Sequence, residues 1–345
     1  MFPQFPVLYL VSSVIVSLVM LALVTPFSAK IGLVDHPNQR KLHKKIIPLT
    51  GGISIFSGII SSLLLLGDMN EIIFSYLISV SIIFVLGIID DIYNISPSLR
   101  FIVQFSIGLF LCYYSNIQIE NLGDLFSLGE VNLGSFSYIF TSIVIVATIN
   151  AFNFLDGVDG LLGSISLVTF SSIGFLYYIK GDSILTLYAL IMFMSIIPFL
   201  LFNFGLGKYK VFSGDSGSMV IGLSVIWLLM LGTRGEIHYF STTTALWIVS
   251  IPIMDMLRVM LVRKINNKSI FRADRSHLHH VLEKITPNSK VITIIVASLS
   301  AIFSLIGIWF DYMNVALSMS LLIFLVSFFL YLIITQCICK DLNPI

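Results

Sequence analysis

Carboxylates gather at two places where long apolar stretches of the sequence end or begin. Asp90 and Asp91 close one apolar run, and adjacent carboxylates there repel each other unless a cation or a proton relieves them. Asp215 stands between glycines in the segment 213–218, at the start of another apolar run, where exposed N–H groups and one hard oxygen ligand meet. A solvated helix end and an ordinary turn are the structural alternatives for these segments. The residue types favour Mg²⁺ binding or proton handling.

The segment 150–161 supplies a third group of polar side chains. They recur every three residues, which places them near one face if the segment is helical; they are Asn150, Asn153, Asp156 and Asp159. Gly157 and Gly160 leave room for backbone or ligand to approach closely. Polar stripes within apolar sequence are functional by default, with an interhelical hydrogen-bond patch as the structural alternative.

Histidines and basic residues collect in two further segments. The loop 30–48 contains Lys41 and His43 and precedes a Gly-Gly step that opens a helix, where free N–H groups favour anions, so we interpret it as a phosphate-binding loop. The loop 261–290 has no cysteine, and carboxylates elsewhere favour Mg²⁺ over Zn²⁺, so we assign it to phosphate and sugar recognition, with a histidine available as acid or base. Its polar residues are Arg263, Asp274, Arg275, His277, His279 and His280.

The composition shows what must position these groups. Hydrophobic residues make up 57% of the 345 residues and charged residues only 11%, whereas soluble domains carry about a quarter charged residues. Apolar runs of about 20 residues, long enough to cross a bilayer, recur along the chain and must be helical because backbone groups in lipid are paired within their own segment. We therefore predict one all-α polytopic membrane domain over 1–345. The eleven expected spans are roughly 7–29, 49–66, 72–89, 99–116, 135–152, 161–179, 184–204, 218–232, 243–260, 291–309 and 315–334.

Basic residues predict the orientation of these spans. With the N-terminus outside and the C-terminus cytoplasmic, all of the 19 lysines and arginines except Lys180 and Arg234 fall on or beside the cytoplasmic face, as the positive-inside rule requires. The same face then holds all five polar segments as active-site loops, at about 30–48, 90–99, 150–161, 205–218 and 261–290.

Acidic groups able to hold Mg²⁺, surrounded by Lys, Arg and His, are suited to phosphoryl transfer, because metal and cations neutralise charge on the transferring group. A site at the mouth of a helix bundle indicates that one substrate lies in the lipid bilayer. A lipid phosphate fits, with its tail among the helices and its head group at the membrane face. Nothing in the sequence points to nucleic acid.

Four motifs in order resemble the signature of polyprenyl-phosphate N-acetylhexosamine-1-phosphate transferases, and the similarity runs over nearly the whole chain. The motifs are Asp90-Asp91 with Asn94, the run 150–161, the run 214–218 and His277-Leu278-His279-His280. The resemblance implies transfer of N-acetylglucosamine 1-phosphate from UDP-N-acetylglucosamine to undecaprenyl phosphate in the bacterial inner membrane, with Mg²⁺ or Mn²⁺ as cofactor. The product would begin a cell-envelope glycan such as the O-antigen of lipopolysaccharide. A homodimer is left open.

The resemblance also implies residue roles. Asp215 and Asn153 would ligate the metal together with the substrate diphosphate, and Asp90 and Asp91 would lie near the lipid phosphate or the metal. Asp159 would help to hold the uracil end of the nucleotide, and Asp156 would organise the pocket. The remaining implied contacts, to diphosphate and sugar, are Arg263, His277, His279 and His280. Catalytic candidates are thus Asp90, Asp91, Asp156, Asp159 and these three histidines; substrate-binding candidates are Lys41, His43, Asn150, Asn153, Asp159, Arg263, Asp274 and Arg275; metal candidates are Asp215, Asn153 and Asp91.

Several alternatives remain open at the level of sequence. The same reaction could use another UDP-N-acetylhexosamine or phospho-muramoyl-pentapeptide, although the latter's relatives typically have three consecutive histidines and Leu278 interrupts them here. A Mg²⁺-dependent membrane prenyltransferase would have two Asp-Asp-x-x-Asp runs, and this chain has one that ends in Asn94. A secondary transporter would place its acids near mid-membrane rather than at helix ends.

Overall fold

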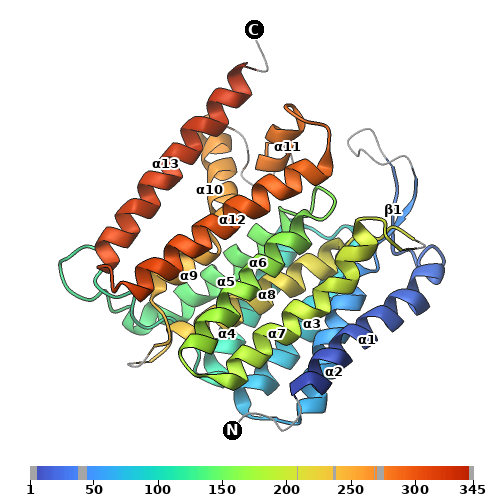
Figure 1. Cartoon of the computed structure of the whole chain (residues 1–345), viewed down its shortest axis with the longest axis horizontal. Helices are drawn as coiled ribbons and strands as arrows, with labels where there is room; N and C mark the ends of the chain where they lie inside the picture. The colour runs from blue at the N-terminus through green and yellow to red at the C-terminus, as the bar shows by residue number, and fades with distance from the viewer. Residues whose placement is uncertain are drawn as a thin grey trace.

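The computed structural model describes residues 6–37, 45–207, 209–235, 238–267, 269 and 276–341, and only the backbone for 339–341. These residues form a bundle of long helices that run roughly along one direction (Figure 1). The helices are α1 (Pro6–Val24), α2 (Gly51–Leu66), α3 (Glu71–Tyr93), α4 (Pro97–Ser115), α5 (Ser137–Asn153), α6 (Leu161–Ile179), α7 (Ser183–Asn203), α8 (Gly214–Thr233), α9 (Thr242–Ile248), α10 (Ser250–Ile265), α11 (Leu278–Glu283), α12 (Ser289–Tyr312) and α13 (Leu317–Asp341). Two single-turn 3-10 helices, η1 (Thr25–Phe27) and η2 (Gly134–Phe136), and one antiparallel pair, β1 (Val34–Asp35) with β2 (Ile47–Pro48), complete the elements.

The polytopic all-α prediction is confirmed, but the count of eleven spans is not. Within the described residues, nine helices are long and apolar enough to cross a membrane, and a tenth is added if α9 and α10 form one span. Helix α2 has 16 residues, about 24 Å, which is shorter than the roughly 30 Å hydrocarbon core. Helices α9 and α10 meet at 79°. Pro252 explains that break, because its ring clashes with the carbonyl of residue 248, the last residue of α9.

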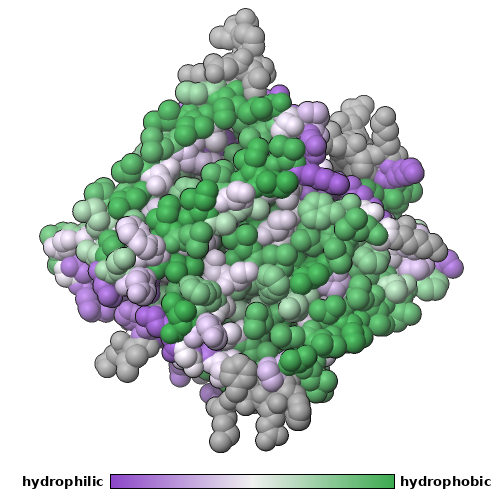
Figure 2. Space-filling view, viewed as in Figure 1, coloured by the Kyte–Doolittle hydropathy of each residue, from purple (hydrophilic) through white to green (hydrophobic). Residues whose placement is uncertain are grey.

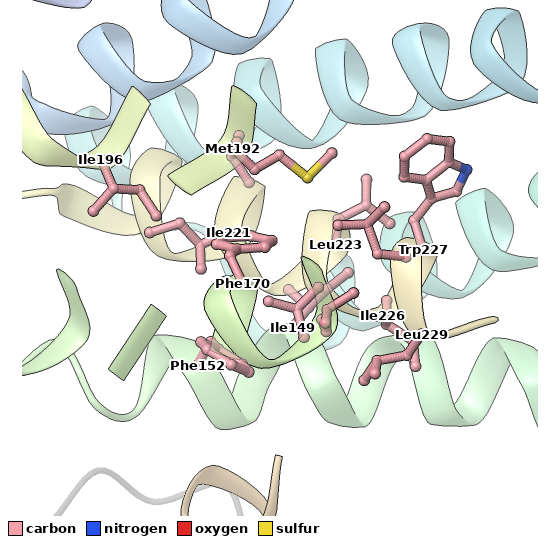
Figure 3. Close-up of a cluster of buried hydrophobic side chains, with 14 of the residues drawn as sticks. Ile149, Phe152, Phe170, Met192, Ile196, Ile221, Leu223, Ile226, Trp227 and Leu229 are labelled. Atoms are coloured by element: carbon pink, nitrogen blue, oxygen red, sulfur yellow. The ribbon is translucent and has the colours of Figure 1, made fainter. Parts of the chain in front are cut away.

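Helix α8 is the centre of the bundle. Its membrane-crossing window is 94% buried, against 17% for α1 and α13 at the periphery. Figure 3 shows Ile221 of α8 among apolar side chains of α5 and α6, including Ile149 and Phe170. Gly222 lets α8 approach α5 closely, because a Cβ there would lie 2.6 Å from the Cα of Ile149. The flank visible in Figure 2 is largely hydrophobic, with hydrophilic patches at the lower left and upper right.

Local signals in the sequence set where the helices around α8 begin and end. Asn94 adopts a left-handed φ of 50°, which ends α3 just after its two aspartates. Ser96 then caps α4 by accepting from the Leu99 N–H, and Pro97 occupies the first helical position. Hydrogen bonds join the C-terminal ends of α3 and α5 to the N-terminal end of α8 at one end of the bundle, which we call the site end. Helix α11 and strand β1 lie at the upper right of Figure 1.

Candidate functional site

Asp91 joins the end of α3 to the start of α8. Its Oδ1 accepts the Asp215 N–H at 2.7 Å and its Oδ2 accepts the Ser216 N–H at 3.2 Å. These N–H groups belong to the first turn of α8, where they have no partner within the helix and where the helix dipole favours an anion. Gly87 permits this contact because a Cβ on it would lie 2.3 Å from the Cα of Ser216. Asp91 thus fixes the backbone that presents Asp215.

Gly214 is required at the same junction for two reasons. Its φ of +70° is left-handed, a conformation that costs other residues energy. A Cβ on Gly214 would also lie 2.5 Å from Oδ2 of Asp91. The glycine before Asp215 is therefore a geometric requirement of the Asp91 cap.

Asn153, the last residue of α5, reaches the same place from a third helix. Its amide Nδ2 donates to Oδ1 of Asp215 at 2.5 Å and to Oγ of Ser218 at 2.8 Å. The Asp215 side chain keeps 29% of its surface exposed, so it can meet a ligand as well as Asn153. The predicted grouping of Asp91, Asn153 and Asp215 is present in the structure.

Asp90 has a different environment from its neighbour Asp91. It is 3% exposed, its Oδ1 accepts the Ile95 N–H at 2.9 Å, and its Oδ2 lies 2.6 Å from an amino group of Arg100. Arg100 also lies 3.6 Å from Oδ1 of Asp215. A buried carboxylate needs such a counter-charge. Asp90 is therefore held by an arginine that faces the centre of the site.

The segment after α5 carries two further aspartates, and the helix that would place all four polar side chains on one face ends at Asn153. Residues 154–160 form turns, with Gly160 at a left-handed φ of +77° that a continuing helix would not use. Asp156 accepts a hydrogen bond from the Ser213 hydroxyl. Burial, with smaller contributions from neighbouring carboxylates, raises the pKa of Asp156 to about 7. Asp159 lies 2.5 Å from the Nζ of Lys210.

The three histidines occupy three environments. His277 Nδ1 lies 2.8 Å from Oδ2 of Asp255, and the ring packs against Phe154 with 4.9 Å between centroids. The His279 ring packs directly on Gly157, where a Cβ would lie 2.2 Å from its Nε2. His280 Nδ1 lies 2.8 Å from a carboxylate oxygen of Glu283. His277 and His279 thus line the segment 154–160, whereas the Nδ1 of His280 meets a residue of its own helix.

Other predicted residues are less central. Asn150 donates to Oε1 of Gln104 in α4 at 2.7 Å and to the Val146 carbonyl of its own helix at 2.8 Å, so its side chain links α5 to α4. Arg263 is buried, with 4% of its surface exposed. The remaining predicted residues lie outside the described residues; they are Lys41, His43, Asp274 and Arg275.

Sequence reasoning missed four residues that complete these contacts: Arg100, Lys210, Ser213 and Asp255. Arg100 was considered only as a basic residue of one membrane face. Lys210 and Ser213 lay within the predicted active-site loop 205–218 but were given no role of their own. Asp255 lay within an apolar run with Arg258 three residues later, and a buried ion pair at this spacing was the signal available.

The donor set near Asp215 suits a hard cation such as Mg²⁺. Asp215 and Asn153 offer oxygen ligands, and Mg²⁺ typically takes one or two protein carboxylates and completes its shell with phosphates and waters. The described residues contain no group of three or more His, Cys, Asp or Glu arranged for a metal. A divalent ion held by Asp215 and Asn153 would depend on substrate phosphates and water for the rest of its coordination.

A cavity of about 300 Å³ lies elsewhere, at the opposite end of the bundle. It is lined by the end of α12, the start of α13 and the segment before α9, including Lys180, Tyr239 and Asp311. Among the residues that the structure describes, none of the predicted site residues borders it.

Comparisons with known proteins identify the family of the chain. Residues 73–233, from α3 to the end of α8, match glycosyl transferase family 4. The undecaprenyl-phosphate alpha-N-acetylglucosaminyl 1-phosphate transferase of Escherichia coli (strain K12) is 37% identical over 305 residues, covering 88% of this chain and 83% of that protein. The enzyme of the same name from Yersinia pestis is 38% identical over 88% of this chain and 84% of its own length. That from Haemophilus influenzae is 37% identical over 90% and 88%. The chain belongs to the family of undecaprenyl-phosphate alpha-N-acetylglucosaminyl 1-phosphate transferases.

Proposed function

We propose that this protein transfers N-acetylglucosamine 1-phosphate from UDP-N-acetylglucosamine to undecaprenyl phosphate and releases UMP. The observation that carries the proposal is the convergence of Asp91, Asn153 and Asp215 from three helix ends, within the region that matches the family. The names of the relatives supply the sugar and the lipid. The proposal places the enzyme in a bacterial inner membrane, with the site end facing the cytoplasm, because the basic residues favour that side.

The reaction exchanges one phosphoanhydride for another. An oxygen of the lipid phosphate attacks the phosphorus that bears the sugar, and the bond from that phosphorus to the bridging oxygen breaks, so that UMP leaves with both electrons. A phosphate monoester has a second pKa of about 6, so the lipid phosphate is mostly dianionic at neutral pH and needs little help from a base. We therefore assign no strong general base to the transfer. Asp90 is consistent with this assignment, because its oxygens already contact the Ile95 N–H and Arg100.

We assign positioning and charge compensation to the protein side chains. Asp91 holds the first turn of α8, and Asp215 with Asn153 would hold Mg²⁺ or Mn²⁺, which supplies neutralisation of diphosphate charge when bound. Arg100, 3.6 Å from Asp215, adds a fixed positive charge on the same side. Asp159 and Lys210 form a partly exposed pair next to this centre and are assigned to the nucleotide end.

The test is a defined assay with purified protein in detergent, MgCl₂ and undecaprenyl phosphate. A panel of UDP-N-acetylglucosamine, UDP-N-acetylgalactosamine and UDP-N-acetylmuramoyl-pentapeptide is scored by UMP release and by the lipid product. We expect UMP release only with lipid present, highest with UDP-N-acetylglucosamine, and loss on adding EDTA. UMP release without lipid, together with a phosphosugar attached to the protein, would replace direct transfer by a covalent route. No turnover of UDP-N-acetylglucosamine would contradict the assignment of the sugar.

A further inference from the structure

Asp255, in α10, is the centre of a buried polar cluster and has no role in the function proposed above. It is 1% exposed, and its two oxygens have distinct partners. Oδ1 accepts three hydrogen bonds, each at 2.9 Å, from the Leu278 N–H, the Tyr331 hydroxyl and an amino group of Arg258. Oδ2 faces His277 Nδ1 at 2.8 Å. One oxygen of a buried carboxylate is thereby reserved for a histidine of the family motif.

The cluster also fixes the backbone on both sides of that histidine. Leu278 donates its N–H to Asp255, and the carbonyl of Ser276 accepts from Arg258. Arg258 is 3% exposed and neutralises Asp255, which makes the pair tolerable inside the protein. His277 is consequently held by its ring and by the peptide groups before and after it.

The held ring faces the segment that follows Asn153. Phe154, the residue next to Asn153, packs on His277, and the His279 ring lies parallel to it, at 6° and 6.0 Å between centroids. His279 in turn packs on Gly157. A shift of the His277 ring would therefore displace Phe154, which is next to the proposed metal ligand Asn153.

We propose that Asp255 is a positioning residue that fixes the tautomer of His277. A carboxylate accepts the proton-bearing Nδ1, so that Nε2 is left as the nitrogen that can take a proton or, once protonated, bind a phosphate oxygen. This inference rests on the proposed function for the identity of the phosphates, which belong to the diphosphate of the nucleotide sugar. The tautomer itself is a property of the protein without substrate.

Asp255→Asn tests the proposal with little change of shape. The three donors around Oδ1 require an oxygen there, so the amide must turn its NH₂ toward His277. Nδ1 must then become the acceptor, and the proton moves to Nε2. We expect kcat to fall by about 10- to 100-fold, as for other groups that orient a working histidine. The KM values for nucleotide and lipid should change by less than about threefold, because binding contacts remain.

A double-mutant cycle separates positioning from general damage. In a His277→Ala background, Asp255→Asn should lower kcat by less than about threefold, since its effect passes through the missing ring. An equal factor in both backgrounds, or no loss in the single mutant, would overturn the proposal. Asp255→Glu, which keeps the charge beside Arg258 but moves the carboxylate, gives the same cycle if the asparagine variant is not recovered folded.

Asp311→Asn is the matched control. Asp311 also accepts several hydrogen bonds, from the Ser241 N–H at 2.9 Å and the Thr244 hydroxyl at 3.2 Å, but it lies at the end of α12 beside the distant cavity. It should lose thermal stability and keep its kcat. Nitrogen-15 NMR of the histidine side chains, assigned with His277→Ala, reads the tautomer without any substrate. A proton on Nδ1 that moves to Nε2 in Asp255→Asn supports the proposal even if the sugar assignment fails, and an unchanged tautomer refutes it.

Discussion

Substituting Gly214 by alanine tests whether the Asp91 cap positions the metal-side carboxylate. The left-handed φ of +70° alone costs alanine about 1–2 kcal/mol. The new Cβ would lie 2.5 Å from Oδ2 of Asp91, about 1 Å inside ordinary contact, so the first turn of α8 must move by that amount. A misplacement of about 1 Å at a catalytic group costs on the order of 100-fold in rate. We expect kcat for UMP release to fall about 100-fold.

Gly67→Ala is the control for backbone strain. Gly67 has nearly the same φ, +72°, but no atom lies within 4 Å of the position of its Cβ, and it follows α2 at the end of the bundle away from the site. Gly67→Ala should lose about 1–2 kcal/mol of unfolding free energy and none of the activity. Both variants are compared by thermal unfolding in detergent and by steady-state UMP release. Equal kcat values for the two variants would refute the idea that the cap positions Asp215.

Three further predictions use the same preparation. Asp215→Asn should lower turnover by roughly a thousandfold if this carboxylate carries the metal, and near-normal turnover at saturating Mg²⁺ would place the metal elsewhere. Arg100→Gln should lower the unfolding free energy by on the order of 2–3 kcal/mol, because it leaves Asp90 buried without its counter-charge, and activity should fall with it. A variant as stable as the unmodified protein would contradict the pairing. In a background without native cysteines, a single cysteine at the exposed position Asn94 should react with an impermeant maleimide only from the cytoplasm. One at the exposed position Asn314 should react only from outside. Labelling of both from one side would exclude the proposed orientation.

The helices could be predicted from the composition and from the length of the apolar runs, because an apolar run of about 20 residues can satisfy its backbone hydrogen bonds in a bilayer only as a helix or within a closed barrel. Their breaks were harder to predict. Pro252 lies only two residues inside α10, and a hydropathy window averages over the 79° bend that it produces. The segment 150–161 places its four polar side chains on one face only if it is helical, and the helix ends at Asn153. The glycines do provide the predicted space, because the His279 ring packs on Gly157 and the Phe204 ring packs on Gly160.

The site was predicted as a set of segments but not as a set of contacts. Ordered motifs identify Asp91, Asn153 and Asp215, yet a sequence gives no sign that Asp91 would use both oxygens on the α8 backbone. Such contacts depend on how closely two helices approach, and that distance is set by Gly87 on one helix against Ser216 on the other. Partners such as Arg100 are invisible for the same reason, because pairing across helices has no fixed spacing along the chain.

Two adjacent aspartates therefore have two tasks that their equal chemistry conceals. Asp91 stabilises a helix start and takes its position from backbone N–H groups, whereas Asp90 is buried and takes its charge balance from Arg100. A general base needs an oxygen that can reach a proton on the substrate, and each oxygen of Asp90 and Asp91 already accepts a hydrogen bond from the protein, so that role would compete with the contacts that hold these side chains. Because the lipid phosphate is already mostly ionised at neutral pH, the proposed transfer requires positioning and charge compensation rather than a strong base, and we assign these tasks to Arg100 and to a metal held by Asp215.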